Sequence, residues 1–217
     1  MLSLEQIHFL LKPHAFHFSL AEQGRTRIIA HPDILEWVLF VLEPAMSLTM
    51  ASKPLPNVLL FADCDRPALS ELLDRFGLKI EVVAKSLPIP GSFWGDEEAG
   101  LIADRLLVRA DTPVHSILHE ACHFICMDHQ RREGLHTNAG GDYDEENAVC
   151  YLQILLSASL PEMGQQRMFA DMDQWGYSFR LGSARAWFNH DADDARQWLQ
   201  RNGILDTQGS PSLGLRS

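Results

Sequence analysis

The chain has 217 residues, of which 46% are hydrophobic and 22% are charged, and its formal net charge is −11. This is the composition of an ordinary globular protein that can bury a good-sized core. The excess of acidic residues disfavours binding to nucleic acid and to anionic membrane surfaces. The apolar segments are far shorter than the ~20 residues of a membrane span. We therefore expect no nucleic-acid partner and no membrane partner.

Cysteine usage and the first residues of the chain bear on its compartment. Residues 1–5 lack the basic region that begins a signal peptide. The four cysteines form no Cys-x-x-Cys pair, and three of them lie in apolar segments. This pattern is typical of free thiols in a reducing compartment rather than of a disulfide framework. The sequence thus predicts a cytoplasmic protein.

Residues 1–86 are predicted to be an α/β portion of the fold. The helix that starts at Asp65-Arg66-Pro67 ends before Gly77, where glycine commonly follows a helix. The elements predicted for this portion are, in chain order, helices over 2–11 and 32–42, a buried strand over 57–62, a helix over 65–76 and a strand over 78–83.

The second part of the chain is predicted to be mostly helical. Asp111-Thr112-Pro113 combines a polar cap with proline at the first helical position, which is a strong signal for a helix start. The elements predicted for this part are a strand over 100–109 that can form a hairpin with 92–95, a helix over 113–127, a helix over 142–157 and two or three further helices as far as residue 205.

These elements predict an α+β fold in which a small mixed sheet packs on the 113–127 helix and the C-terminal half is mostly helical. A single domain is expected over residues 1–205. Its parts are the N-terminal portion 1–86, a metal-binding core over 87–160 and C-terminal helices over 161–205, followed by a flexible tail over 206–217.

The 113–127 helix contains the pattern His-Glu-x-x-His, formed by His119, Glu120 and His123. Residues four apart lie on one face of a helix with Cβ atoms ~5–6 Å apart, so both imidazoles can bind one cation. Glu120 lies beside that face, where it can take a proton from water held by the metal without being a ligand. Since the surrounding residues are apolar, these polar groups need compensation, and a zinc ion supplies it. The alternative is two ordinary histidines that hydrogen-bond to backbone carbonyls.

A catalytic zinc ion commonly has three protein ligands, and the helix over 142–157 is expected to provide the third. Glu145 lies on a face of this helix that continues apolar, which favours it as an inward-pointing ligand. Glu146 shares its face with Cys150 and Gln153. This second face is less uniformly apolar, so Glu146 is the alternative ligand.

Several other side chains are candidates for supporting roles. His115 lies one turn before His119 and is expected to be an exposed residue of the first turn rather than a second donor to the site. Trp94 flanks the predicted hairpin and is the tryptophan to watch for substrate contact. Cys122 and Cys126 are weaker candidates for metal ligands, because Cys122 points away from the histidine face. Hydrogen bonds to a transition state are possible from Tyr143, Tyr151, His136 or His190.

The segment from Glu145 to Leu156 resembles the Glu-x-x-Ala…aromatic…Leu-Leu helix of the ImmA/IrrE-like metallopeptidases, which are zincins with two histidines and a downstream glutamate. The resemblance covers residues 90–160. It departs from the family pattern at Cys122, where Gly or Ala is common, and at Val149, where Asn is usual.

This resemblance implies a zincin-like fold, in which the ligands are His119, His123 and Glu145 and the base is Glu120. It also implies that the strand over 100–109 forms the edge of the cleft and pairs with an extended peptide. The implied activity is that of a zinc-dependent metallopeptidase acting on a peptide or protein substrate.

Two other functions stay open. Two histidines and one carboxylate also form the triad that binds iron in non-haem oxygenases. Arg105-Leu106-Leu107-Val108 is similar to a segment before the same motif in the elongation factor P hydroxylases, and this weaker resemblance implies an iron-dependent hydroxylase of a protein. The third possibility is a metal-binding regulatory protein without turnover.

Overall fold

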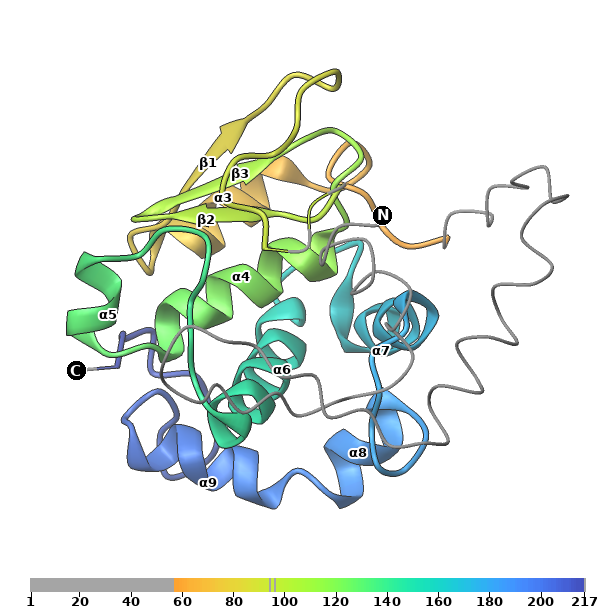
Figure 1. The fold of residues 1–217 in the computed structure, drawn as a ribbon. Helices are drawn as coiled ribbons and strands as arrows, with labels where there is room; N and C mark the ends of the chain where they lie inside the picture. Colours follow the sequence, from red (N-terminus) through yellow and green to blue (C-terminus); the bar gives the residue numbers. More distant parts are fainter. Residues whose placement is uncertain (1–56, 94, 96, 217) are drawn as a thin grey trace, which may run out of the picture. The chain divides into compact units, whose positions relative to one another are not determined.

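The structure is a computed structural model that describes residues 57–93, 95 and 97–216 (Figure 1). The described residues belong to one compact unit. The helices predicted over 2–11 and 32–42 lie outside the described residues, and so does Trp94.

Helix α3 (Arg66–Asp74) lies within the range predicted for it. The side chain of Asp65 caps its start, because Oδ1 accepts a hydrogen bond of 3.0 Å from the backbone N–H of Ala68. Such a cap contributes ~1 kcal/mol to stability. Gly77 follows the helix with a φ of +77°, a conformation that glycine adopts without steric cost.

Strand β1 (Lys79–Val82) confirms the strand predicted after this helix. The strand predicted over 57–62 is wrong. In that segment the structure has one isolated bridge, between Leu60 and Pro113, followed by a turn. Val58, Leu59 and Phe61 are buried, and backbone hydrogen bonds join the segment to residues 110–114, but they do not continue as a regular strand ladder. The hydrophobic pattern reports burial and not strand pairing.

The strand predicted over 100–109 is a hairpin of two strands, β2 (Gly100–Ile102) and β3 (Arg105–Val108). The chain reverses at Ala103 and Asp104, and Ala103 has a φ of +52°. Strand β3 lies in the middle of the sheet, antiparallel to β2 and parallel to β1. The described residues therefore confirm an α+β fold with a small mixed sheet.

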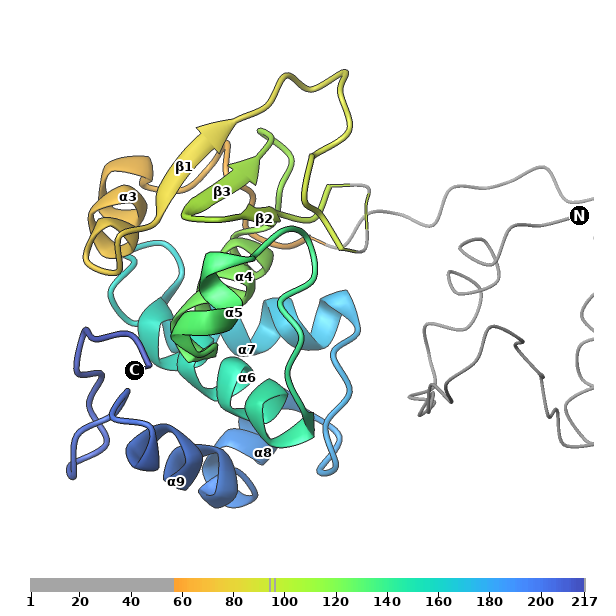
Figure 2. The same cartoon turned by 60° about the vertical axis from the view of Figure 1, so that its left-hand side comes forward.

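Helix α4 (Val114–Cys126) packs against the sheet and against helix α6 (Tyr143–Ser157), as Figures 1 and 2 show. Both helices were predicted within one residue of these bounds. Asp142 caps α6, since its Oδ1 accepts a hydrogen bond of 2.9 Å from the N–H of Glu145. Apolar side chains of α4, α6 and the sheet form one core, which surrounds the helix that carries His119 and His123.

The C-terminal helices confirm the prediction of a helical second half. They are α7 (Gly164–Trp175), α8 (Ala184–His190) and α9 (Asp193–Arg201). A short helix between α4 and α6, α5 (His129–Glu133), was not predicted. It has no buried residue, so it carries no hydrophobic pattern.

The segment after α9 makes specific contacts where the sequence predicts a flexible tail. Asp206 Oδ1 accepts hydrogen bonds from the N–H groups of Gln208 and Ser210, at 2.8 and 2.9 Å. Farther on, the N–H of Arg216 donates a hydrogen bond of 3.0 Å to the carbonyl of Ile125 at the end of α4. Polar composition predicted a tail, but the polar groups are used in turns and in contacts with the core helix.

Among the described residues, no helix combines the length and the apolar character needed to cross a membrane.

Candidate metal centre

His119 and His123 lie one turn apart on α4, and their Nε2 atoms approach each other closely. The two Nε2 atoms are 3.1 Å apart, and the ring planes are almost perpendicular, at 89°. The i, i+4 spacing on an α-helix produces this proximity, as the sequence predicts. Both side chains are mostly buried, with 14% and 12% of their surface exposed.

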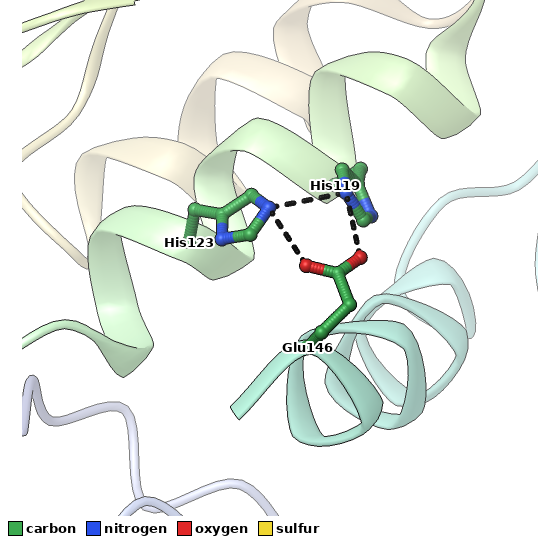
Figure 3. Close-up of side chains that lie close together, drawn as sticks. All are labelled: His119, His123 and Glu146. Atoms are coloured by element: carbon green, nitrogen blue, oxygen red, sulfur yellow. Dashed lines mark hydrogen bonds and ion pairs between the residues drawn. The ribbon is translucent and has the colours of Figure 1, made fainter. Parts of the chain in front are cut away.

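Glu146, in the first turn of α6, brings a carboxylate to the two rings (Figure 3). Its Oε1 lies 3.4 Å from Nε2 of His119, and its Oε2 lies 3.4 Å from Nε2 of His123. Because α4 and α6 pack against each other, two nitrogen atoms and a carboxylate from segments 23 residues apart converge on one point. The structure thus brings together three of the groups that commonly bind metal ions.

Nε2 of His119, Nε2 of His123 and the carboxylate of Glu146 form a triangle whose geometry fits a metal ion. Ligand atoms ~2.0–2.2 Å from a tetrahedral zinc ion stand ~3.3–3.6 Å from one another. The separations between the three side chains are 3.1 to 3.4 Å. Neutral imidazole nitrogens and a carboxylate are also the donors that suit zinc and iron. The residues present therefore fit the ion that the sequence implied.

The structure does not bring Glu145, the third ligand favoured from sequence, to the histidines. Its carboxylate, with 6% of the side chain exposed, accepts hydrogen bonds of 2.6 and 2.8 Å from Arg131 Nη2 and one of 3.1 Å from Arg216 Nη1. Neighbouring residues on a helix differ by ~100° in direction. Glu145 therefore points towards two arginines and Glu146 towards the rings, and Glu146 replaces Glu145 as the candidate third ligand.

Glu120 lies next to the triangle, and it lines one pocket together with His119, His123 and Glu146. The side chain is buried, and burial raises the pKa of its carboxyl group to about 7. His119 opposes this shift, while the carboxylates of Glu98 and Glu146 add to it. A carboxyl group with a pKa near neutrality can both accept and return a proton.

Gln153, which is fully buried on α6, determines how His119 presents its ring. Its Oε1 lies 2.8 Å from Nδ1 of His119. An amide oxygen only accepts hydrogen bonds, so Nδ1 carries the proton and the lone pair of Nε2 is directed at the triangle. The amide orientation is consistent with a second contact, in which Gln153 Nε2 lies 3.6 Å from the sulfur of Met168.

The two histidines differ in the electrostatic effect of their surroundings. Burial lowers the pKa of His119, but Glu146, Glu120 and the hydrogen bond that His119 donates to Gln153 outweigh this effect, and the net pKa is raised. For His123, burial, His119 and Arg131 all act in one direction and lower the pKa well below its ordinary value. Its buried Nδ1 has no hydrogen-bond partner among the described residues.

His115 is not the exposed first-turn residue that the sequence predicted. Its side chain is fully buried against Trp175, with ring centroids 4.9 Å apart, and against the edge of Tyr177, at 5.7 Å. Neither ring nitrogen has a hydrogen-bond partner among the described residues. Burial, with a contribution from His119, lowers the pKa of His115 to about 3.

The four proposed donors to a transition state do not meet at the triangle. Tyr143 is 65% exposed, and Tyr151 stacks on Phe188 with centroids 4.6 Å apart. His190 is the last residue of α8, and His136 interacts with the hydroxyl of Thr137 at 2.9 Å.

Sequence reasoning missed Tyr177 and the role of Gln153. The Tyr177 ring packs edge-on against His119, with centroids 5.8 Å apart, and burial raises the pKa of its hydroxyl well above the ordinary value. Gln153 did carry a signal, because it is a polar residue two turns after Glu146 on the same face of a helix that is otherwise apolar there. Tyr177 lies in a loop after α7, and no periodicity reports on such a position.

A pocket of about 190 Å³ opens above the triangle. Its floor consists of the two histidines, Glu120 and Glu146. Its walls come from two loops, one before β2 and one between α5 and α6. The residues that line these walls are Phe93, Thr137, Asn138, Ala139 and Gly140.

No protein-family model, curated protein or solved structure matches the chain.

Proposed function

We propose that the protein is a zinc-dependent hydrolase, in which His119, His123 and Glu146 bind the ion and Glu120 is the general base. The observation that carries this proposal is the triangle of two Nε2 atoms and one carboxylate, separated by 3.1 to 3.4 Å at the floor of a pocket. The position of Glu120 beside this triangle favours hydrolysis, since hydrolysis needs a base next to the attacking water.

A zinc ion bound here would lower the pKa of water to ~7 and polarise a substrate carbonyl. The chain's own groups carry the proton. The carboxylate of Glu120 takes it from the attacking water as the new carbon–oxygen bond forms. The same carboxyl group then gives it to the leaving nitrogen as the carbon–nitrogen bond of the amide breaks. Gln153 keeps the proton of His119 on Nδ1 throughout, so that Nε2 stays available as a donor of electrons.

An iron-dependent hydroxylase is the second candidate, because two histidines and one carboxylate also match the facial triad that binds Fe(II). Such an enzyme does not need Glu120 as a base. A variant that lacks this base separates the two candidates. A third reading, a metal-binding protein without turnover, predicts bound metal and no activity in any variant.

The first experiment measures the metal content of protein purified without a polyhistidine tag, by plasma emission spectroscopy. We expect about one zinc ion per chain in the wild type and in His190→Ala, a matched control at the end of α8. His123→Ala and Glu146→Gln are expected to lose the ion. Absence of zinc from the wild type, even after zinc is added, contradicts the proposal, and iron in its place favours the hydroxylase.

The second experiment addresses the chemistry. Glu120→Gln should keep the zinc ion and lose hydrolysis of an amide or ester substrate by ~10²–10⁴-fold, the usual contribution of a general base. Retention of full activity in this variant contradicts the role of Glu120. Oxygen-dependent turnover that survives in Glu120→Gln supports the iron enzyme.

A further inference from the structure

The outer edge of strand β2, next to the pocket, already has hydrogen-bonding partners. The N–H of Leu101 donates to the carbonyl of Gly91 at 3.1 Å, and the carbonyl of Leu101 accepts from the N–H of Thr137 at 3.0 Å. The N–H of Ala103, just after the strand, donates to the carbonyl of Leu135 at 3.0 Å. Two short segments, 91–92 and 135–137, therefore cover the edge that an extended peptide would need in order to join the sheet.

The first of these segments is in close backbone contact with the strand. A Cβ atom on Gly100 would lie 2.0 Å from the carbonyl oxygen of Pro90, and one on Gly91 would lie 2.6 Å from Cγ1 of Ile102. Gly91 also has a φ of +75°. Glycine at both positions lets the backbones approach this closely, so the segment is built to lie on the edge of β2.

Both covering segments lead directly into the walls of the pocket. Phe93 follows the first segment, and Asn138, Ala139 and Gly140 follow the second. The second wall is held in place by the guanidinium group of Arg131, which donates a hydrogen bond of 3.3 Å to the carbonyl of Ala139. The walls enclose about 190 Å³, less than the ~300–1,000 Å³ of typical ligand pockets.

We propose that the substrate is a short or terminal amide, whose reacting carbonyl enters the pocket without a chain continuing on both sides of it. This inference rests on the proposed hydrolase function. An internal bond of a long peptide needs a groove and a sheet edge with unpaired backbone groups. At this site the edge is paired, and residues of the two covering loops line a small pocket. The substrate class therefore differs from the extended peptide paired with the edge strand that the resemblance to zincins implied.

Binding of three phosphinates to zinc-loaded protein, measured by calorimetry, tests the inference. The first probe has one methyl group on each side of the phosphinate, the second carries a blocked tripeptide on one side, and the third carries a blocked tripeptide on both sides. We expect the first two to bind, and the third to bind no more tightly than the better of them. Tighter binding of the second than of the first indicates a chain terminus, and equal binding indicates a small molecule.

Three outcomes overturn the inference. One is binding of the two-sided probe at least 100-fold tighter than the others. The second is that zinc-loaded protein binds none of the probes. The third is fast amide hydrogen exchange at Leu101, Ala103 and Thr137 in the free protein, because the paired edge predicts protection at all three. Absence of bound zinc in the same preparation overturns the hydrolase function instead, and the metal measurement distinguishes that case.

A pair of variants at Thr137 tests whether the covering segment 135–137 is what limits binding of the two-sided probe. Thr137→Pro removes the N–H that Leu101 accepts and cannot adopt the φ of +69° found there, so it should detach the segment. Thr137→Gly keeps the N–H and tolerates this φ. Both variants remove the same side chain from the pocket wall, so the comparison is between them, and binding of the two-sided probe should be at least tenfold tighter in Thr137→Pro than in Thr137→Gly. Equal binding in both variants shows that the cover does not limit access.

Discussion

Two neighbouring glutamates in the first turn of α6 lie in opposite environments. Glu145 is buried and is held by Arg131 and Arg216. Glu146 is half exposed, and its carboxylate lies next to His119 and His123 and accepts a contact of 4.0 Å from the thiol of Cys150. Burial raises the pKa of Glu145, although both arginines oppose it. Such a carboxylate is stable as an anion only because the protein supplies two positive charges.

The end of α4 next to Glu145 is closed in the same way. A helix leaves its last four carbonyl groups without partners inside the helix. Here two arginines donate to all four, so that α4, α5 and the segment after α9 are joined at one point. The contacts are Arg132 with the carbonyls of Phe124 and Met127, and Arg216 with those of Ile125 and Cys126.

The comparison separates a structural carboxylate from a candidate ligand. Protein cations already neutralise the charge at Glu145, and no capacity is left there for a metal ion. At Glu146 the neighbours are imidazoles, which are neutral when they act as ligands, so a divalent cation would complete the site. A carboxylate beside two imidazole nitrogens is therefore the better candidate ligand, whereas burial of a carboxylate alone does not mark one.

Replacement of each glutamate in turn by glutamine is expected to give the largest effect, which is on zinc affinity. Glu146→Gln should weaken zinc binding by more than ~100-fold, since the loss of a ligand exceeds the ~10–100-fold effect of removing an outer partner. Glu145→Gln should weaken it by less, because the hydrogen bonds from the arginines to the amide oxygen persist in part. Competition with a chelator of known affinity measures both. The reverse order of effects would make Glu145 the ligand and would remove the basis of the comparison.

His115, on α4, is a buried polar group whose ring nitrogens have no hydrogen-bond partner among the described residues. Burial lowers its pKa from 6.5 to about 3. Below pH 6.5 the unfolded chain therefore takes up a proton that the folded chain refuses, and stability falls as the pH falls towards 3. Between pH 7 and pH 4 this amounts to about 3 kcal/mol.

Urea unfolding of metal-free wild type and His115→Phe at pH 7 and pH 4 measures this effect. The phenylalanine variant should lose about 3 kcal/mol less than the wild type over this interval, because it has no group to protonate. Parallel pH dependence in the two proteins would show that His115 has a hydrogen-bond partner in solution. His136→Phe, at an exposed position, is the control and should follow the wild type.

The closed end of α4 is expected to contribute to stability more than to metal binding. Arg216→Ala removes one of two cations from Glu145 and the side-chain donor to the carbonyl of Cys126 at the end of the helix, while Arg131 stays in place. We expect a loss of about 1–3 kcal/mol in the free energy of unfolding. Arg196→Ala, which breaks an exposed ion pair with Asp193, is a matched control and should cost about 0–1 kcal/mol. Equal effects of the two variants would mean that the contacts of Arg216 are not maintained in solution.

The difference between Glu145 and Glu146 also marks the limit of sequence reasoning. The spacing of His119 and His123, the start of α4 and the range of α6 follow from local rules, and the structure agrees with them. The choice between two adjacent carboxylates depends on where the arginines lie. Arg216 is 71 residues from Glu145, and no local rule relates the two. The hairpin turn at Ala103 was missed for a related reason, since it uses no glycine or proline.

The smallest predicted effect concerns the candidate metal centre, where Gln153 accepts a hydrogen bond from His119. Gln153→Leu leaves Nδ1–H of His119 without an acceptor in a buried position, which lets the ring change tautomer and turn Nε2 away from the ion. We expect zinc affinity to fall about tenfold, at the lower end of the ~10–100-fold range for such partners. Met168→Leu removes the contact of Gln153 Nε2 with the Met168 sulfur and leaves the hydrogen bond to His119, so it is the matched control. If both variants lower the affinity equally, packing around Gln153 rather than its hydrogen bond positions His119.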